Sequence, residues 1–558
     1  MHTLLGETPI RRRSGRVVAL GSTAVLAAAG VGPLVMLTSS TASANTALVV
    51  STLADSGAGS LRQAMLAANA AAGVDTITFT AGLTGTIDVL SDLPDLTGGI
   101  DLQGPGASVI TIDGGWTAAG GDVTGHSLFV LDRLYGADGT TTIAGITITG
   151  GNGSNNADEG SGGAIQKFEG DADLTIADVV LSGNYASNDG GAVHLYETSG
   201  TVTIRDSVIS NNVAYYAGGA LYASNYSNNG ALFLNLSNVE ISGNSAGDAG
   251  GGLYLDQTIT TISNSTIDGN VSDDDGGGIY VDTGSLTIID STISGNEGVT
   301  GGGIYADDLY TDLEIFNSTI SGNHATSDSE PFLYNGNTFV NGGGGGIYLT
   351  NGTNAVLIQS TVTANSTNAL TDAAGGIQSA QGRPEPLSTS GSSARRQSSD
   401  KKENRSTQTS VSPSVAGDLR LIGSIVAGND GFDIASWDGS APVVNTEYSV
   451  LGVIDPAVTL VDGGGTQVGV TNPMLGLLAN NGGVTKTHAL LAGSPAIDAG
   501  PDPVPAFDGN EFDQRGVGFA RIVFGVADAG AFEMQEPEPE PTTTTAPTTE
   551  PVVPAFTG

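Results

Sequence analysis

Residues 291–305 read STISGNEGVTGGGIY, and close variants of this stretch recur along the chain. Residues 265–280 read STIDGNVSDDDGGGIY, and NSTISGN returns at 317–323. Each copy holds a β-branched run, Gly-Asn, a block of glycines and then Ile-Tyr. Self-similarity at a short, nearly fixed period predicts one structural unit that is stacked many times.

Two interleaved motifs mark the period. The asparagine motif recurs every 26 to 32 residues, at Asn184, Asn212, Asn244, Asn270, Asn296 and Asn323, with related positions at Asn365 and Asn429. The aliphatic residue that follows the glycines recurs at Ile165, Val193, Leu221, Leu253, Ile279, Ile304, Ile347 and Ile377. Since both motifs share a period near 27 residues, we expect two corners in each repeat.

The segments between the corners have the texture of strands. SLTIIDSTIS (285–294) and TVTIRDSVIS (201–210) alternate aliphatic with polar residues, which is the period of a half-buried strand. Helical spacing is missing from the repeats, and a propeller blade would need ~40–45 residues. The pattern predicts an all-β fold, a parallel β-helix (solenoid), and the handedness of parallel crossovers makes it right-handed.

Stacking then assigns a role to each motif. We expect the asparagine to adopt the left-handed backbone of a corner and its amide to hydrogen-bond along the stack. The glycines should turn the other corner, where φ is positive and neighbouring coils approach closely. The aliphatic residues should point inward and form a continuous core.

The N-terminus resembles an export signal. Four arginines precede a stretch without charge from Val17 to Leu37, and an ASA cleavage signature follows at 42–44. We expect residues 1–44 to be a signal peptide, with an uncleaved membrane anchor as the alternative. The protein should therefore be secreted or held at the cell surface or cell wall.

Residues 45–82 differ from the repeats and suit an N-terminal cap. SLRQAMLAANAA (60–71) is an amphipathic helix that places Leu61, Ala64, Met65 and Ala68 on one face. Ser60 and Gln63 match a capping box at its start. A solenoid needs such a cover over its open first coil.

The repeats extend over residues 83–465, and two segments break their pattern. Residues 379–416 hold six basic residues and almost no aliphatic ones, which predicts a disordered insert. A basic binding arm or a sequence artefact would give the same composition. Residues 536–558 are rich in Pro, Glu and Thr and predict a disordered, extended stalk.

Composition excludes several classes of protein. The chain has 58 acidic and 18 basic residues, a net charge of −40, so it should repel nucleic acid. It has no cysteine, so an exported chain must be held together by its core rather than by disulfides. We expect a monomer that meets extracellular polysaccharide or another cell-surface component, and a membrane only through an anchor not present in this chain.

Two stretches carry a resemblance to known families. VVSTLADSGAGSLRQAMLAANAAAGVDTITF (49–79) resembles the opening segment of many secreted bacterial parallel β-helix repeat proteins. Within residues 466–535, NGGVTKTHALL, SPAIDAG and DQRGV occur in the order found in the choice-of-anchor Q domain, which closes such proteins. The resemblance implies an exported, surface-associated protein, and it implies no defined reaction and no catalytic residues.

A ladder of outward residues is the candidate site. After each inward aliphatic residue the next should point outward, which aligns Tyr222, Tyr254, Tyr280, Tyr305 and Tyr348. Two residues further stand Asp256, Asp282 and Asp307. One interpretation is a flat aromatic strip for sugar rings beside carboxylates that bind hydroxyls or calcium. The other is that the tyrosines only stack to stabilise the sheet.

No complete catalytic motif accompanies the ladder, so we expect no enzymatic activity and no required cofactor, with calcium as the one candidate metal. The leading hypothesis is a non-enzymatic, adhesin-like protein that binds glycans or another surface. The alternatives are a polysaccharide lyase or glycoside hydrolase, since the fold alone cannot decide an activity, and a purely structural surface spacer.

Overall fold

The computed structural model describes residues 47–535, except residues 72, 119–124, 127, 132–139, 156–159, 227–229, 308–310, 328–331, 335–336, 340–341, 351, 369–372, 381–417 and 437–441. The predicted signal peptide (1–44) and stalk (536–558) lie outside the described residues. So does nearly all of the predicted insert (379–416).

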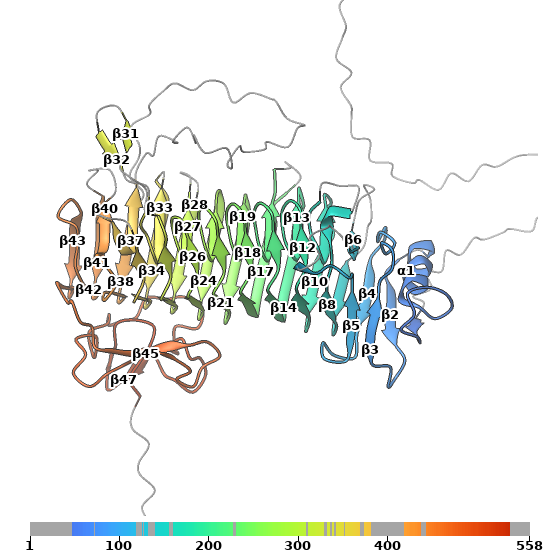
Figure 1. Cartoon of the computed structure of the whole chain (residues 1–558). Coiled ribbons are helices and arrows are strands. Elements are labelled where there is room, and N and C mark those ends of the chain that lie inside the picture. The colour runs from blue at the N-terminus through green and yellow to red at the C-terminus, as the bar shows by residue number, and fades with distance from the viewer. Residues whose placement is uncertain are drawn as a thin grey trace, which may run out of the picture. The chain divides into compact units, whose positions relative to one another are not determined.

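One coil shows how the repeat folds. It begins with β24 (Gly284–Ile289), continues through β25 (Thr292–Ser294) and the short β26 (Glu297–Gly298), and returns through β27 (Ile304–Ala306). The next coil repeats this course, and the chain stacks coil on coil in parallel register (Figure 1). Leu286 pairs with Leu313, and Ile304 pairs with Ile347, so equivalent residues lie beside each other along the stack.

Equivalent strands of successive coils form three large sheets within the described residues. The 25-stranded sheet has two columns that β14 (Gly200–Ser210) and β17 (Leu232–Ser242) join. The other strands of its first column are β1 (Ala47–Val50), β2 (Asp75–Phe79), β4 (Ile100–Gln103), β7 (Thr141–Ala144), β10 (Leu174–Ala177), β20 (Thr258–Ser263), β24, β28 (Thr311–Phe316), β34 (Asn354–Ile358), β38 (Leu419–Ile422), β41 (Val443–Glu447) and β43 (Thr459–Gly464). Those of its second column are β3 (Gly85–Asp88), β5 (Ile110–Asp113), β8 (Thr147–Thr149), β11 (Val180–Ser182), β21 (Thr266–Asp268), β25, β29 (Thr319–Ser321), β35 (Thr361–Thr363), β39 (Ile425–Val426), β42 (Val450–Leu451) and β44 (Gln467–Val468).

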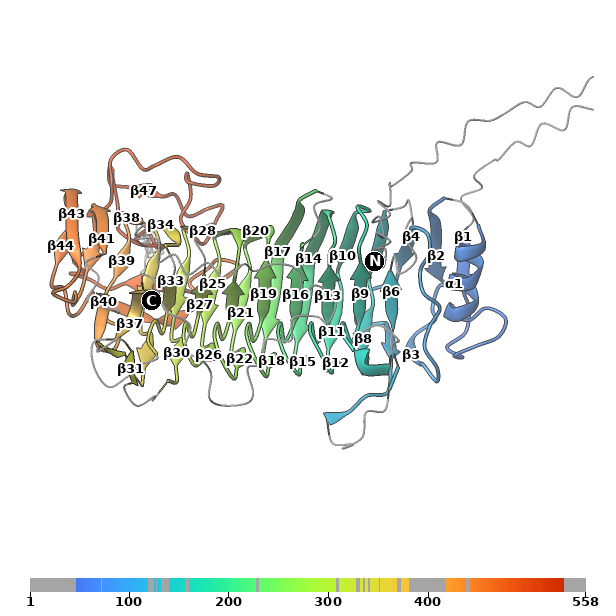
Figure 2. The ribbon, with the colours of Figure 1, turned by 90° about the horizontal axis from the view of Figure 1, so that it is seen from above.

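Two further sheets complete each coil. The ten-stranded sheet holds β6 (Phe129–Leu131), β9 (Ile165–Phe168), β13 (Val193–Tyr196), β16 (Leu221–Ser224), β19 (Leu253–Asp256), β23 (Ile279–Val281), β27, β33 (Ile347–Thr350), β37 (Ala374–Ala380) and β40 (Phe432–Ser436). The seven-stranded sheet holds β12 (Tyr185–Ala186), β15 (Val213–Ala214), β18 (Ser245–Ala246), β22 (Val271–Ser272), β26, β30 (His324–Ala325) and β36 (Ser366–Thr367). Its short strands form a row along one edge of the stack in Figure 2.

The alternation read from the sequence places the core as expected. Leu286 and Ile288 are fully buried inside the coil, whereas Thr287 between them is partly exposed. Buried aliphatic residues from Val50 to Leu451 form one continuous cluster along the stack. Each fully buried aliphatic side chain contributes about 1.5–3 kcal/mol relative to an exposed one, so the core is the main source of stability.

The corners differ from the prediction in two ways. Each regular coil has three left-handed corners rather than two, as at Asp290 (φ 50°), Gly295 (φ 63°) and Gly301 (φ 65°). The ladder asparagine does not itself adopt the left-handed backbone. The residue before it does, because Gly295 has no Cβ to clash while Asn296 turns its amide into the coil.

The asparagines form the hydrogen-bonded ladder that the sequence predicted. The Nδ2 atom of Asn296 donates to Oδ1 of Asn323 at 2.9 Å and to the carbonyl of Ile267 at 3.0 Å. The backbone N–H of Asn296 also donates to Oδ1 of Asn323. The same pattern runs without a break from Asn184 to Asn429, whose amide donates to the carboxylate of Asp433.

The N-terminal segment joins the stack. Its helix α1 (Leu61–Ala70) begins at the cap residue Ser60 and buries Leu61, Ala64, Met65 and Ala68, the face predicted from the sequence. The capping box is half formed. Ser60 Oγ accepts from the backbone N–H of Gln63, but the side chain of Gln63 accepts from Gly59 rather than from Ser60.

The remaining elements lie outside the three sheets. They are η2 (Gly153–Asn155), the hairpin of β31 (Phe332–Tyr334) and β32 (Asn337–Phe339), and four strands of residues 466–535, which we call the C-terminal module: β45 (Leu475–Ala479), β46 (Thr487–Leu490), β47 (Ile522–Val523) and β48 (Val526–Ala527). No helix in the described part of the chain is both long and apolar enough to cross a membrane.

Candidate functional site

The predicted tyrosine column exists, and its rings stack on one another. Adjacent ring centroids lie 4.9–5.2 Å apart and adjacent ring planes differ by only 6–7°, through Tyr222, Tyr254, Tyr280, Tyr305 and Tyr348. His194 extends the column at its N-terminal end, 5.2 Å from Tyr222. Each inner ring therefore presents both faces to its neighbours.

The column is also less exposed than the sequence suggested. Tyr305 and Tyr348 are 3% and 2% exposed, and Tyr222, Tyr254 and Tyr280 are half-buried. The glycine corner before β27 packs closely against the tyrosine: a Cβ atom at Gly301 would lie 2.9 Å from the Cβ of Tyr305. The ring faces are used within the stack, so the flat aromatic strip for sugar rings stays a prediction.

The three aspartates line up in register next to the tyrosines, but they do not form an open row. Asp256 and Asp307 are 1% and 8% exposed, and Asp282 is half-buried. Tyr226 hydrogen-bonds to Asp256, and burial is the main cause that raises the pKa of Tyr226, with the Asp256 charge second. Within the described residues no group of three or more His, Cys, Asp or Glu side chains is arranged to hold a metal ion, so calcium at Asp256, Asp282 and Asp307 stays a prediction without geometric support.

Sequence reasoning missed how the C-terminal module attaches. The module lies beside the coils (Figure 1), and Gln514 Oε1 accepts from Thr319 Oγ1 at 2.6 Å. The amide of Gln514 also contacts Thr292 Oγ1 at 2.9 Å, and Thr292 donates to the carbonyl of Lys486 at 2.6 Å. His488 Nε2 lies 2.7 Å from Ser321 Oγ. The outward side chains of Thr292 and Thr319 are therefore buried. Their counterpart in the preceding coil, Thr266, is partly exposed.

Charged motif residues hold the module together beneath this contact. Asp513 pairs with Arg515 at 2.5 Å, and the Arg515 guanidinium lies between the rings of Phe519 and Phe532, 4.0 and 3.8 Å from their centroids. Glu533 accepts from the backbone N–H groups of Val523 and Asp528, while burial raises the pKa of Glu533 to about 8. Residues 513–516 (DQRG) and 528–533 (DAGAFE) thus have an architectural role.

Replacing Gln514 with Ala should loosen this attachment. Thr292 and Thr319 would each lose a hydrogen bond to Gln514 within a buried contact, and each such loss costs about 1–3 kcal/mol. We expect faster hydrogen exchange at Gly530 and Ala531, whose amides bond to Gly423 and Thr361 on the coils. The matched control is Gln535→Ala, where an exposed amide is lost; equal exchange in both variants would contradict the assignment.

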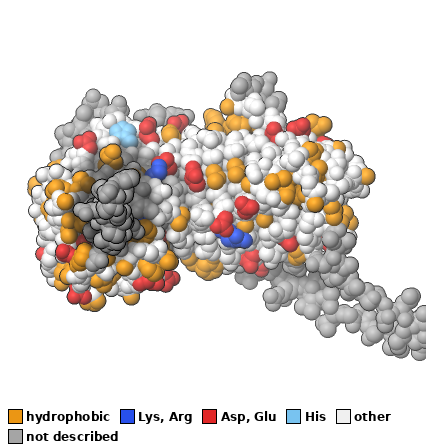
Figure 3. All heavy atoms as spheres, turned by 90° about the horizontal axis from the view of Figure 1, so that it is seen from below, with side chains coloured by type: hydrophobic (Ala, Val, Ile, Leu, Met, Phe, Trp, Pro, Cys, Tyr) orange, Lys and Arg blue, Asp and Glu red, His pale blue; other side chains and the backbone are white. Residues whose placement is uncertain are grey.

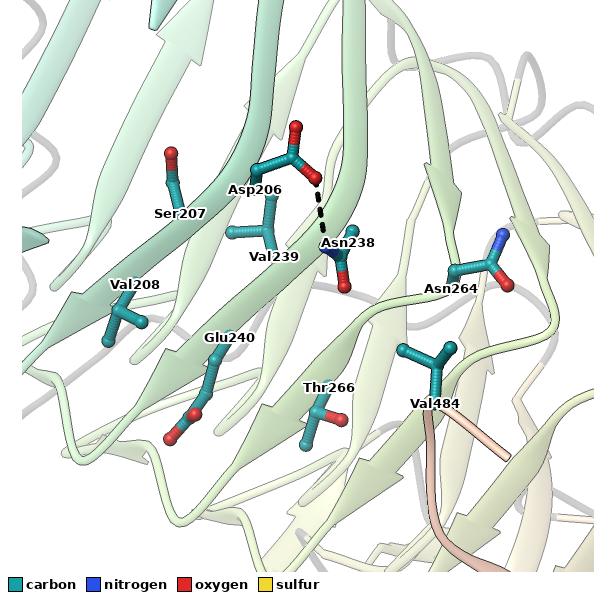
Figure 4. A pocket seen from close by; sticks show the side chains of 9 residues that line it. All are labelled: Asp206, Ser207, Val208, Asn238, Val239, Glu240, Asn264, Thr266 and Val484. Atoms are coloured by element: carbon teal, nitrogen blue, oxygen red, sulfur yellow. Dashed lines mark hydrogen bonds between the residues drawn. The ribbon is translucent and has the colours of Figure 1, made fainter. Parts of the chain in front are cut away.

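A hollow of about 290 Å³ lies on the coils beside Val484 of the C-terminal module (Figure 4). Two parallel rows of side chains line most of it. One row holds the left-handed corner residues Asp206, Asn238 and Asn264, and the other holds the outward strand residues Val208, Glu240 and Thr266, with Val484 of the module at one end. Further along the stack the same rows continue as Asp290 and Asn317 and as Thr292 and Thr319, and there the module covers them.

Asp206 is the charged centre of this hollow. Its carboxylate accepts from Asn238 Nδ2 at 2.9 Å and from Arg205 Nη1 at 2.8 Å. The hydrogen bond from Asn238, followed by that from Arg205, lowers the pKa of Asp206 below its ordinary value. The carboxylate is therefore ionised at neutral pH and acts as a hydrogen-bond acceptor.

A match to a family model agrees with the architecture. The family model described as a right-handed beta helix region matches residues 133–320 and 229–384. The fold is a right-handed parallel β-helix. The A-module of a mannuronan C-5 epimerase from Azotobacter vinelandii is similar with a TM-score of 0.40 and 15% identity, over 73% of this chain and 92% of that module. No curated protein matches the sequence.

Proposed function

We propose that this β-helix is exported to the cell surface or secreted and binds an uncharged extracellular glycan without cleaving it. One observation carries the proposal: the hollow combines polar side chains from both rows with the aliphatic side chains of Val208 and Val484. Sugar rings have the matching chemistry, with hydroxyl groups that donate and accept hydrogen bonds and C–H faces that pack on aliphatic side chains.

The groups in the hollow suit hydroxyls. Asp206 and Glu240 offer acceptor oxygens, and Asn264 is exposed with an amide that can both donate and accept. Val208 and Val484 supply the aliphatic contact. A volume of about 290 Å³ is at the lower end of the range for small-molecule sites, which suits one or two sugar units of a longer chain.

Charge supports an uncharged ligand. The chain carries a net charge of −40, and the face viewed in Figure 3 has acidic side chains and few basic ones among mostly uncharged groups. Two carboxylates line the hollow itself. A polyuronate or a sulfated glycan would be repelled by the net charge of the chain and by the two carboxylates in the hollow.

The charge state of Asp206 suits a hydrogen-bond acceptor rather than a general acid. A glycoside hydrolase needs a carboxylic acid whose raised pKa keeps a proton for the leaving group. The pKa of Asp206 is shifted the other way. A purely structural spacer, the remaining alternative, would leave the hollow without a ligand.

Filling the hollow tests the proposal. Thr266→Phe places an aromatic ring in the hollow, at an outward strand position where aromatic residues are favourable. It should weaken glycan binding at least tenfold, which corresponds to about 1.4 kcal/mol. Thr203→Phe, an outward threonine away from the hollow, is the matched control. Calorimetric titration with neutral polysaccharides measures both; unchanged affinity in Thr266→Phe would remove the hollow from the binding site.

A further inference from the structure

Four aromatic side chains gather beside the seven-stranded sheet, apart from the tyrosine column and from the hollow. The rings of Trp116 and Tyr185 stack with centroids 4.8 Å apart and planes 7° apart. Tyr215 and Tyr216 pack edge to face at 4.9 Å. Tyr185 begins β12, and Tyr215 directly follows β15 in the next coil. We call these four residues the aromatic platform.

The platform is exposed to solvent, unlike the tyrosine column. Tyr215 is 60% exposed, and the other three rings are partly exposed. The register of β12, β15 and β18 places Ser187 before Tyr215 and Gly247 after it at the equivalent positions of the adjacent coils. Neither residue is large enough to cover the Tyr215 ring as a neighbouring tyrosine would.

The backbone holds the platform in place. The N–H of Tyr215 donates to the carbonyl of Ala186 at 3.0 Å, and that of Tyr216 donates to the carbonyl of Asn188 at 3.0 Å. Trp116 is held in the same way by the carbonyl of Gly150 at 2.8 Å. Rings on a rigid surface lose little conformational entropy when a ligand binds, which favours affinity.

We propose that the aromatic platform is a second glycan-binding site, which stacks the uncharged sugar rings of a neutral polysaccharide. This proposal rests on the proposed function and adds a separate site to it. The surroundings favour a sugar over an apolar protein surface, because Ser187 and Asn188 come directly after β12 and supply a hydroxyl and an amide. The acidic balance of the chain disfavours an anionic glycan here as well.

Fluorescence of Trp116 reports on the platform directly. The chain has two tryptophans, so Trp437→Phe in the full chain leaves Trp116 as the only one. Titration with cellohexaose and mannohexaose should change the Trp116 emission in a saturable way with at least one of them, and hexagalacturonate should not. Tyr215→Ala should weaken this binding roughly three- to tenfold, the usual range for an aromatic contact.

Tyr226→Ala is the matched control, because Tyr226 is 50% exposed but lies at the Asp256 side of the coils. The Trp116 emission of this variant should respond to the oligosaccharides as in the parent protein. Since Tyr215 is mostly exposed, its variant should also keep the parent melting temperature, which separates lost binding from lost folding.

The possible outcomes separate this proposal from the proposed function. Retention of a neutral glycan without any change at Trp116, or with Tyr215→Ala titrating like the parent, overturns the platform and leaves the proposed function standing. A Tyr215-dependent signal accompanied by cleaved oligosaccharide keeps the platform and overturns the non-enzymatic function. A response to hexagalacturonate alone, or self-association of the parent that Tyr215→Ala abolishes, overturns the platform.

Discussion

Replacing Ile279 or Ile304 with Asp should unfold several neighbouring coils. Both side chains are 0% exposed, and each pairs with an equivalent isoleucine in the next coil. A carboxylate there has no partner, and a buried unpaired charge costs several kcal/mol. That is a large part of the roughly 5–15 kcal/mol by which folded domains are stable, so we expect a large fall in melting temperature and fast hydrogen exchange in the adjacent coils.

Thr287→Ser is the control for this prediction. Thr287 lies between two inward residues of β24 and points outward, where it is partly exposed. Loss of its methyl group should change the free energy of unfolding by less than about 0.5 kcal/mol. If the isoleucine and threonine variants melt at similar temperatures, the inward register of the ten-stranded and 25-stranded sheets is wrong.

Asn296→Leu should have a comparable effect by a different route. Asn270 donates to Oδ1 of Asn296 through its backbone and its side chain, at 2.9 Å each. Leucine cannot accept either bond, and it also leaves Oδ1 of Asn323 and the carbonyl of Ile267 without the bonds from Nδ2. Each buried group that loses its partner costs about 1–3 kcal/mol, so the total loss should reach several kcal/mol.

Packing makes the same substitution worse. A Cβ atom at Gly278 would lie 3.0 Å from Nδ2 of Asn296, so the two corners are in close contact and the bulkier methyl groups of leucine would crowd the space that the planar amide fills. Asn235→Leu is the matched control, because Asn235 points outward from β17 and is half-buried. Urea unfolding of the two variants measures the difference, and a loss below about 1 kcal/mol for Asn296→Leu would show that the ladder is not a source of stability.

The ladder illustrates how far the sequence alone could reach. Strand alternation and a strict period align every residue with its counterpart one coil away, so the inward isoleucines and the amide ladder could be predicted. The exact backbone of the corner could not. Both residues of a Gly-Asn pair tolerate the left-handed region, and only the inward amide of Asn296 decides that Gly295 takes it.

The tyrosines and aspartates show the limit more clearly. The period predicts that Tyr305 points away from the core, but exposure depends on what packs over the strand, and Tyr305 is 3% exposed. Ring orientation is also hidden in the sequence, because a column of tyrosines could present faces or edges to solvent. The hollow and the aromatic platform each bring together residues that do not occupy equivalent positions of the repeat. Val484 and Asp206 both line the hollow, and Trp116 stacks on Tyr185 in the platform.

Binding and cleavage of a glycan panel, measured in the same samples, test whether the protein binds a neutral glycan without cleaving it. The protein without residues 1–44 is incubated with neutral and acidic polysaccharides, and both the retained fraction and the new reducing or unsaturated ends are quantified. We expect that at least one neutral polysaccharide is retained and that no new ends appear, while acidic polysaccharides stay free. New ends that increase with protein concentration, or the retention of none of the neutral polysaccharides, would contradict it.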